Sequence, residues 1–195
     1  MKLKIYRVIF IILLLGAIVL ITLIGVKQWK SMENEKENQE VLETFSNIEI
    51  QDSGTVQLKG YDVIGVVTIP KIDIQYPILA IETSNPEETK EPMRYGIVKY
   101  WGGNVNDYGN LSIAGHNNYN GTMFGKTKNL EIGDVVELTD LTQTTMQYEI
   151  YDIFVTYPND VSILATNDET IREVTLITCT NGNRERLILK AKQII

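Results

Sequence analysis

The sequence is poor in the residues that crosslink small domains or bind metals. Its 195 residues contain one cysteine, Cys179, and one histidine, His116. A single thiol excludes an internal disulfide, and one histidine with one cysteine makes a poor zinc site. In a domain that lies outside the membrane, a cysteine without a partner is either an intermolecular link or a reactive thiol.

Positive charge is also scarce. The chain has 18 lysine and arginine residues against 25 aspartate and glutamate residues, a formal net charge of −7. This balance argues against a nucleic acid as a partner, because phosphate binding needs a basic face. With 44% apolar and 22% charged residues, the composition is that of a globular protein, and the length suits one domain with an appendage.

An uncharged stretch near the N-terminus predicts a membrane anchor. Val8 to Val26 spans 19 residues, and a helix of that length, about 28 Å, can cross a hydrocarbon core of about 30 Å. A cleaved signal peptide is the alternative, but its apolar region usually has about 7–15 residues, and no small-x-small site follows Val26. Three basic residues precede the span and two follow it, which places the N-terminus inside and the domain outside.

The composition divides the chain into four parts. They are a cytoplasmic N-terminus at 1–7, a transmembrane anchor at 8–26, a polar stalk or linker at 27–60 and a folded domain at 61–195. Within the stalk, Ser31 to Thr44 is rich in Glu, Lys, Asn and Gln. This segment forms either a solvated helix or a loose chain, and in both cases we expect it to act as a spacer.

From Tyr61 onward, short apolar runs alternate with turn residues, a pattern typical of an all-β domain. The predicted strands are Val63–Ile69, Ile72–Leu79, Leu111–Ala114, Val135–Leu138, Met146–Val155, Val174–Cys179 and Leu187–Ala191. Short helices are expected from Asn85-Pro86 and within Met123–Leu130. Many short strands with few helices predict a β-barrel or a β-sandwich.

Cys179 ends a run of β-branched residues and precedes the turn signal Asn181-Gly182. A strand end can present a side chain to a cleft, and cysteine is a good nucleophile because part of it is thiolate near neutral pH. A buried structural thiol is the alternative. His116 follows Gly115, which gives the backbone freedom to aim a ring; an ordinary core or surface histidine is the alternative. Only the fold can bring these two residues together.

At these positions the chain resembles the sortases, the membrane-anchored cysteine transpeptidases of Gram-positive bacteria. Thr175-Leu176-Ile177-Thr178-Cys179 is similar to their TLxTC signature. Ala114-Gly115-His116 matches the segment that carries their catalytic histidine, and Arg186-Leu187-Ile188-Leu189 matches the strand that carries their arginine. The resemblance extends from about Val63 to the end. It implies an eight-stranded β-barrel with short helices, preceded by the transmembrane helix, and a catalytic domain at 61–195.

The resemblance also implies a function. The enzyme would cleave an LPxTG-like sorting motif of secreted proteins through a thioester on Cys179, with His116 as acid and base and Arg186 as the third catalytic residue. An amine from a peptidoglycan precursor or a pilin lysine would accept the acyl group. Ala114 and Thr178 are candidate substrate-binding residues. Hydrolysis of the motif, pilin polymerisation and a membrane-tethered binding module without turnover are the alternatives.

Local geometry and the family match disagree about the arginine. A tight type I′ hairpin centred on Asn181-Gly182 would place Arg184 opposite Cys179 and Arg186 opposite Ile177. The family's arginine, however, immediately precedes an apolar strand, here Leu187-Ile188-Leu189. We therefore assign Arg186, with Arg184 in reserve. Either arginine would supply a fixed positive charge that can stabilise an oxyanion or hold a substrate carbonyl.

The segment before the cysteine strand bears on subclass and on metals. Tyr157–Arg172 matches the groove-forming loop of sortases and is too short for the helical insertion of class B, which favours class D or a class A-like enzyme. Some sortases bind calcium near this loop, where the oxygen donors of this chain are Asn159, Asp160, Asp168 and Glu169. Their density is ordinary for a loop, so we predict no required metal and no cofactor.

Overall fold

The computed structural model describes residues 2–47, 56–81, 88–166 and 168–194. It contains two compact units, Met1–Gln39 and Glu40–Ile195. The helix expected at Asn85-Pro86 lies outside the described residues.

Helix α1 runs without interruption over Lys2–Ser46. Among the described residues it is the one helix that is long and apolar enough to cross a membrane. Its apolar side chains from Tyr6 to Val26 are exposed, as in a helix that has no protein neighbour there. Of the two alternatives for Ser31–Thr44, the structure shows the helix. Its last turns belong to the second unit, in which Leu42 and Phe45 are buried.

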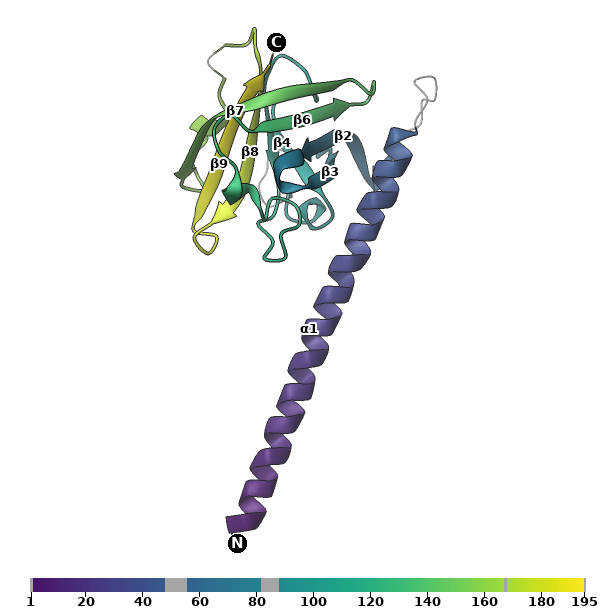
Figure 1. Cartoon of the computed structure of the whole chain (residues 1–195), viewed down its shortest axis with the longest axis vertical. Helices are drawn as coiled ribbons and strands as arrows, with labels where there is room; N and C mark the ends of the chain where they lie inside the picture. Colours follow the sequence, from purple (N-terminus) through teal and green to yellow (C-terminus); the bar gives the residue numbers. More distant parts are fainter. Residues whose placement is uncertain (1, 48–55, 82–87, 167, 195) are drawn as a thin grey trace. The chain divides into compact units, whose positions relative to one another are not determined.

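The second unit is a β-barrel with short 3₁₀ helices (Figure 1). Its strands are β1 (Gln57–Leu58), β2 (Tyr61–Ile69), β3 (Ile74–Leu79), β4 (Ile97–Trp101), β5 (Gly109–Ala114), β6 (Val135–Asp140), β7 (Thr145–Thr156), β8 (Arg172–Thr180) and β9 (Glu185–Gln193). Its 3₁₀ helices are η1 (Pro70–Ile72), η2 (Pro92–Arg94), η3 (Thr127–Asn129) and η4 (Ser162–Leu164).

Within the described residues, eight strands close the barrel in the order β2-β3-β4-β5-β8-β9-β7-β6, and β6 pairs back onto β2. The two-residue strand β1 only flanks β2. Two neighbouring pairs are parallel, β3 with β4 and β5 with β8, and the other pairs are antiparallel. The expected eight-stranded barrel is confirmed. Strand β4 was missed by the sequence analysis, although Gly96 and Gly102 bound its apolar run.

Alternation of side chains separates two cores, because successive residues of a strand face opposite sides of the sheet. Val174 and Leu176 of β8 join the cluster that fills the barrel, together with Leu111 and Ile113 of β5. Ile177 of β8 faces the other way. The second cluster covers the outside of the wall and contains Leu42, Phe45, Val56, Leu58, Val63, Val66, Leu79, Val98, Ala114, Ile163, Ile177 and Ile188. The candidate catalytic residues Cys179 and Arg186 lie on this outer face.

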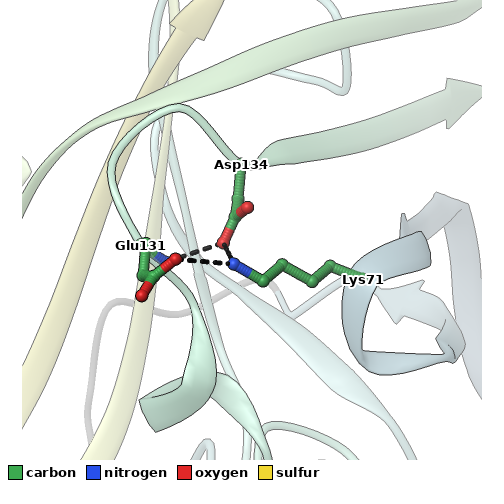
Figure 2. A network of polar contacts seen from close by, with 3 residues as sticks. All are labelled: Lys71, Glu131 and Asp134. Atoms are coloured by element: carbon green, nitrogen blue, oxygen red, sulfur yellow. Dashed lines mark hydrogen bonds and ion pairs between the residues drawn. The ribbon is translucent and has the colours of Figure 1, made fainter.

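An ion network ties two connections of the barrel together (Figure 2). The Lys71 ammonium in η1 lies 2.9 Å from Asp134 and 3.0 Å from Glu131, both in the turn before β6. The Glu131 backbone N–H also donates to the Asp134 carboxylate at 2.7 Å. Burial raises the pKa of Asp134, but this N–H and the ammonium outweigh it, so the pKa lies below its usual value. The network reinforces the side of the barrel where β2 meets β6.

Candidate active site

The parallel pairing of β5 with β8 brings the two sequence-predicted reactive residues to the same edge of the barrel. Its register places Ser112 beside Thr175 and Ala114 beside Ile177. The Gly115 backbone N–H continues the ladder by donating to the Ile177 carbonyl at 3.1 Å. His116 and Cys179 therefore follow directly on neighbouring strands, although 63 residues separate them in the sequence.

These residues open into one groove on the outer face, with a volume of about 450 Å³. Ala114, His116, Thr178, Cys179 and Arg186 all line it. Its walls come from the segment before β4, from β4 itself and from the connection between β7 and β8; they include Thr89, Lys90, Met93, Tyr100, Tyr157, Pro158, Asp160, Val161, Ile163 and Leu164. The structure thus brings all five candidate residues of the sequence analysis to one groove.

Cys179 is half-buried at the end of β8, so its thiol is neither in the core nor fully in solvent. The strand backbone around it is fixed on both sides. Its carbonyl accepts a hydrogen bond from the Asn117 side-chain amide at 2.8 Å. On the other side, Cys179 pairs with Arg186 in the antiparallel ladder of β8 and β9. A half-exposed thiol on a rigid strand, with an arginine as its ladder partner, has the setting of a reactive cysteine.

His116 is half-buried in the same groove. Burial lowers the pKa of its imidazole below the usual 6.5, and the nearby Arg94 guanidinium lowers it further. The ring is therefore mostly neutral at pH 7, and one of its nitrogens can accept a proton. Its backbone carbonyl accepts the Phe124 N–H at 3.0 Å, which anchors the loop that follows.

Gly115 is required for space and not for the backbone freedom that the sequence analysis expected. It is not among the described residues with positive φ. A Cβ at this position would instead lie 2.4 Å from Ile97 Cδ1 and 2.9 Å from Phe124 Cδ2. The Gly115 carbonyl accepts the buried Thr178 hydroxyl at 2.8 Å. The side chain of Thr178 thus holds the two strands together beneath the groove.

The arginine register differs from the tight hairpin that the sequence predicted. Cys179 pairs with Arg186 and Thr180 with Glu185, so four residues, Asn181 to Arg184, form the turn. Asn183 continues the left-handed conformation of Asn181 and Gly182, with φ of 70°, 48° and 66° respectively. Asparagine tolerates this conformation, so the turn extends past Asn181-Gly182. The exposed Arg184 side chain donates from Nε to the Asn181 carbonyl at 3.1 Å.

The Arg186 guanidinium is anchored at one nitrogen. Nη1 donates to the Asn183 carbonyl at 3.2 Å and to the Glu185 carbonyl at 3.1 Å. Its Nε and Nη2 carry the other three N–H donors of the planar fork, for which the described residues provide no partner. A fixed cation with donors to spare can stabilise an oxyanion or hold a carbonyl.

Several site residues were not found by the sequence analysis. Asn117 directly follows His116, and this adjacency was the one local signal for it. Arg94, Met93 and Tyr100 had no such signal, because only the barrel brings residues 88–100 beside β5 and β8. By contrast, the contribution of Tyr157 and the residues after it was expected, and Tyr157–Leu164 supplies six groove residues.

Two acidic side chains of this connection, Asp160 and Asp168, are engaged within their own loop. Asp160 accepts the hydroxyls of Thr156 and Ser162 and the Ser162 N–H, and Asp168 accepts the hydroxyl and N–H of Thr170. In the part of the chain that the structure describes, no group of three His, Cys, Asp or Glu residues is arranged to hold a metal. Metal independence stays a prediction.

Comparisons with known proteins agree with this geometry. A family model of the sortase domain matches residues 67–194. A Clostridium perfringens sortase D5 transpeptidase is 30% identical, with a TM-score of 0.64 over 83% of this chain and 98% of that one. Sortase A of Corynebacterium diphtheriae has the same fold at 24% identity, with a TM-score of 0.60 over 88% and 85% of the chains.

A third solved structure, of Clostridium perfringens sortase C with the C-terminal cell wall sorting motif, also shares the fold. It is 22% identical, with a TM-score of 0.59 over 85% of this chain and 88% of that one. No curated protein sequence matches the chain.

Proposed function

The chain belongs to the sortase family of transpeptidases, and we propose from this premise that it cleaves an LPxTG-like sorting motif of secreted proteins and transfers the acyl fragment to an amine. The observation that carries the proposal is the convergence of Cys179, His116 and Arg186 on one groove. A thiol, a mostly neutral imidazole and a fixed cation are the groups that acyl transfer through a thioester requires.

In the first half of the reaction, the Cys179 sulfur attacks the carbonyl carbon of the motif's penultimate threonine. As the sulfur attacks, the neutral His116 takes the thiol proton; the C–N bond to the next residue then breaks, and His116 passes that proton to the departing amine. The Arg186 fork donates to the carbonyl oxygen while it carries negative charge. The product is a thioester between Cys179 and the N-terminal part of the substrate.

In the second half, an amine attacks the thioester. His116 takes a proton from the incoming nitrogen, the C–S bond breaks and the thiol is restored. The acceptor is a peptidoglycan precursor or a pilin lysine. We assign the enzyme to class D or to a class A-like group, which is supported by its 30% identity to a sortase D5 transpeptidase.

The groove fits an extended peptide. Six residues give the groove apolar surface: Met93, Tyr100, Ala114, Ile163, Leu164 and Ile177. An apolar surface of this kind binds aliphatic side chains by removing their surface from water. Ala114 would touch the peptide, and Thr178 would support the groove through its bond to Gly115.

We further propose that residues 8–26 anchor the enzyme in the cell membrane with residues 1–7 inside and the catalytic domain, from residue 61 onward, outside. Support comes from the apolar, exposed helix α1 and from the basic residues that precede it. An anchored enzyme would meet secreted proteins as they leave the membrane.

A screen of sorting-motif peptides with the full chain in detergent micelles tests the proposal. Each peptide is incubated with and without an added amine, and the products are identified by mass. A transfer product in the presence of amine is expected with the parent and not with Cys179→Ala. Cleavage to the free acid alone would favour the hydrolytic alternative, and no thiol-dependent cleavage of any motif would contradict both.

A further inference from the structure

A buried polar cluster lies on the same face of β5 and β8 as the reactive residues. Alternation places Asn110, Ser112 and Ala114 of β5 on the outer face of the wall, beside Thr175 and Ile177 of β8. Ser112 and Thr175 have no exposed surface, and Asn110 is 7% exposed. Buried polar side chains are costly unless they are hydrogen-bonded, so this cluster needs an explanation.

The cluster is satisfied by the groove wall. Asn110 Nδ2 donates to the backbone carbonyls of Ile163 at 3.3 Å and Leu164 at 3.1 Å, and lies 3.3 Å from Ser112 Oγ. Its Oδ1 accepts the Thr175 hydroxyl at 2.9 Å. Carbonyls can only accept, so the amide nitrogen must face η4 and the amide oxygen must face Thr175. Thr175 therefore gives the buried amide oxygen its partner and helps to hold the amide in the orientation that the carbonyls require.

These bonds join helix η4 to the barrel wall, where Ile163 also packs in the outer core. Ile163 and Leu164 are the last two residues of η4, and both line the groove. The other polar contacts of this segment are at the surface, where Asp160 accepts the Ser162 N–H and Lys190 donates to the Ala165 carbonyl at 3.3 Å. A single 3₁₀ turn has little stability of its own. The buried amide is thus the contact that water competes with least.

We propose that Asn110, oriented by Thr175, is a positioning residue pair that fixes η4 as a wall of the groove and so sets the affinity for the sorting-motif peptide. The part of this proposal that concerns peptide affinity rests on the proposed function. The part that concerns the position of η4 does not. Neither residue lines the groove. The pair acts on the peptide only through Ile163 and Leu164. We therefore expect it to change peptide binding and not the chemical steps.

The test compares three variants of the full chain in micelles. Thr175→Val keeps the shape and removes the hydroxyl, and Thr175→Ser keeps the hydroxyl. Tyr148→Phe is the matched control, because the buried Tyr148 hydroxyl donates to Asn106 Oδ1 at 3.0 Å and Tyr148 is not among the groove residues. KM and kcat are measured on one motif peptide. Amide exchange is followed at Leu164 and Ala165, which donate to Val161 and Ser162 at 3.1 and 3.3 Å.

We expect Thr175→Val to raise KM by about 5- to 10-fold, the effect of one lost buried hydrogen bond, with kcat changed by less than about twofold. Exchange at Leu164 and Ala165 should become faster by a similar factor. Thr175→Ser and Tyr148→Phe should each leave KM and this exchange within about twofold of the parent. Asn110→Asp replaces the two N–H donors of the amide by an acceptor oxygen. It should therefore raise KM and speed this exchange by more than Thr175→Val does.

A lower kcat at unchanged KM would overturn the proposal, since the pair would then act on the reactive residues. An equal rise of KM in Tyr148→Phe would overturn it too, because general loosening would explain both. If Asn110→Asp does not fold, the two Thr175 variants decide. If the parent cleaves no motif peptide, the proposed function fails, while the exchange of Leu164 and Ala165 still decides whether the pair holds η4.

Discussion

Cys179 and Arg186 are direct partners across the antiparallel ladder of β8 and β9. Side chains of such a pair stand on the same face with Cβ atoms about 4.5–5.5 Å apart. The neighbouring pair on this face is Ile177 with Ile188, which belongs to the outer core. The hairpin therefore brings the Cβ atoms of Cys179 and Arg186 together by register alone, without any contribution from a distant segment. Strands β8 and β9 lie side by side at the yellow end of the colour scale in Figure 1.

This register gives the first prediction. Arg186→Ala should lower kcat/KM on a motif peptide by about 10²–10³, as the loss of one oxyanion donor does. Arg184→Ala is the matched control and should cost far less, because the exposed Arg184 makes one bond to its own turn. Arg186→Lys should restore little, since an ammonium lacks the planar fork. A greater loss in Arg184→Ala than in Arg186→Ala would contradict the assignment.

The second prediction concerns the thiol. Cys179→Ala should abolish transfer and cleavage but leave thermal unfolding nearly unchanged, because a half-buried side chain contributes little packing. The parent should lose activity on treatment with a thiol-alkylating reagent, which can modify only one site in this chain. An alanine variant that still forms the transfer product would show that another group is the nucleophile.

The third prediction uses the single histidine, whose ring signals can be followed by NMR without assignment. The pKa of His116 should lie below 6.5, because burial and then Arg94 disfavour the imidazolium. Arg94→Ala should raise it. Between the folded and unfolded pKa values the unfolded chain binds more protons, so this residue's contribution to stability is present above 6.5 and is lost as pH falls through the folded pKa.

A midpoint above 6.5 for the parent would contradict the third prediction. It would mean that an anion faces the ring more closely than Arg94 does, and the Cys179 thiolate would be the first candidate. Repeating the titration with Cys179→Ala separates the two cases.

The fourth prediction tests the close packing at Gly115. Gly115→Ala should destabilise the fold by about 1–3 kcal/mol, the usual cost of overpacking, because its Cβ would meet Ile97 Cδ1 and Phe124 Cδ2. Ile97→Val removes the nearer of these atoms. Thermal unfolding of the two single variants and the double variant should therefore show that the second change partly rescues the first. If the two losses simply add, the contact with Ile97 is not the cause.

The fifth prediction concerns topology. If helix α1 anchors the protein with its domain outside, a membrane-impermeant maleimide should label Cys179 on intact cells. Cys179→Ala gives the background, since the chain has no other thiol. Labelling only after the cells are opened would place the domain inside and contradict the proposed orientation.

The sequence determined the features that depend on short-range patterns. Short apolar runs rich in β-branched residues and bounded by turn residues located β2, β3, β5, β6, β7, β8 and β9 to within a few residues. The uncharged run from Val8 to Val26 likewise predicted the long apolar helix. The sequence also predicted that Cys179 and His116 are functional residues. Each is the one residue of its kind in the chain, and each lies in a motif that resembles the sortases.

Tertiary structure decided the rest, and the reason is physical in each case. The turn after Cys179 could have had two or four residues, because a shift of two leaves every side chain on the same face and the apolar pattern fits both. Asn183 in its left-handed conformation selected the longer turn. The local sequence could not show that Ile97 and Phe124 leave no space for a side chain at Gly115. Nor could it show that Asn110 donates hydrogen bonds to the carbonyls of η4. Those contacts exist only in the folded barrel, where β5, which carries Asn110 and leads into His116, pairs with β4 on one side and with β8 on the other.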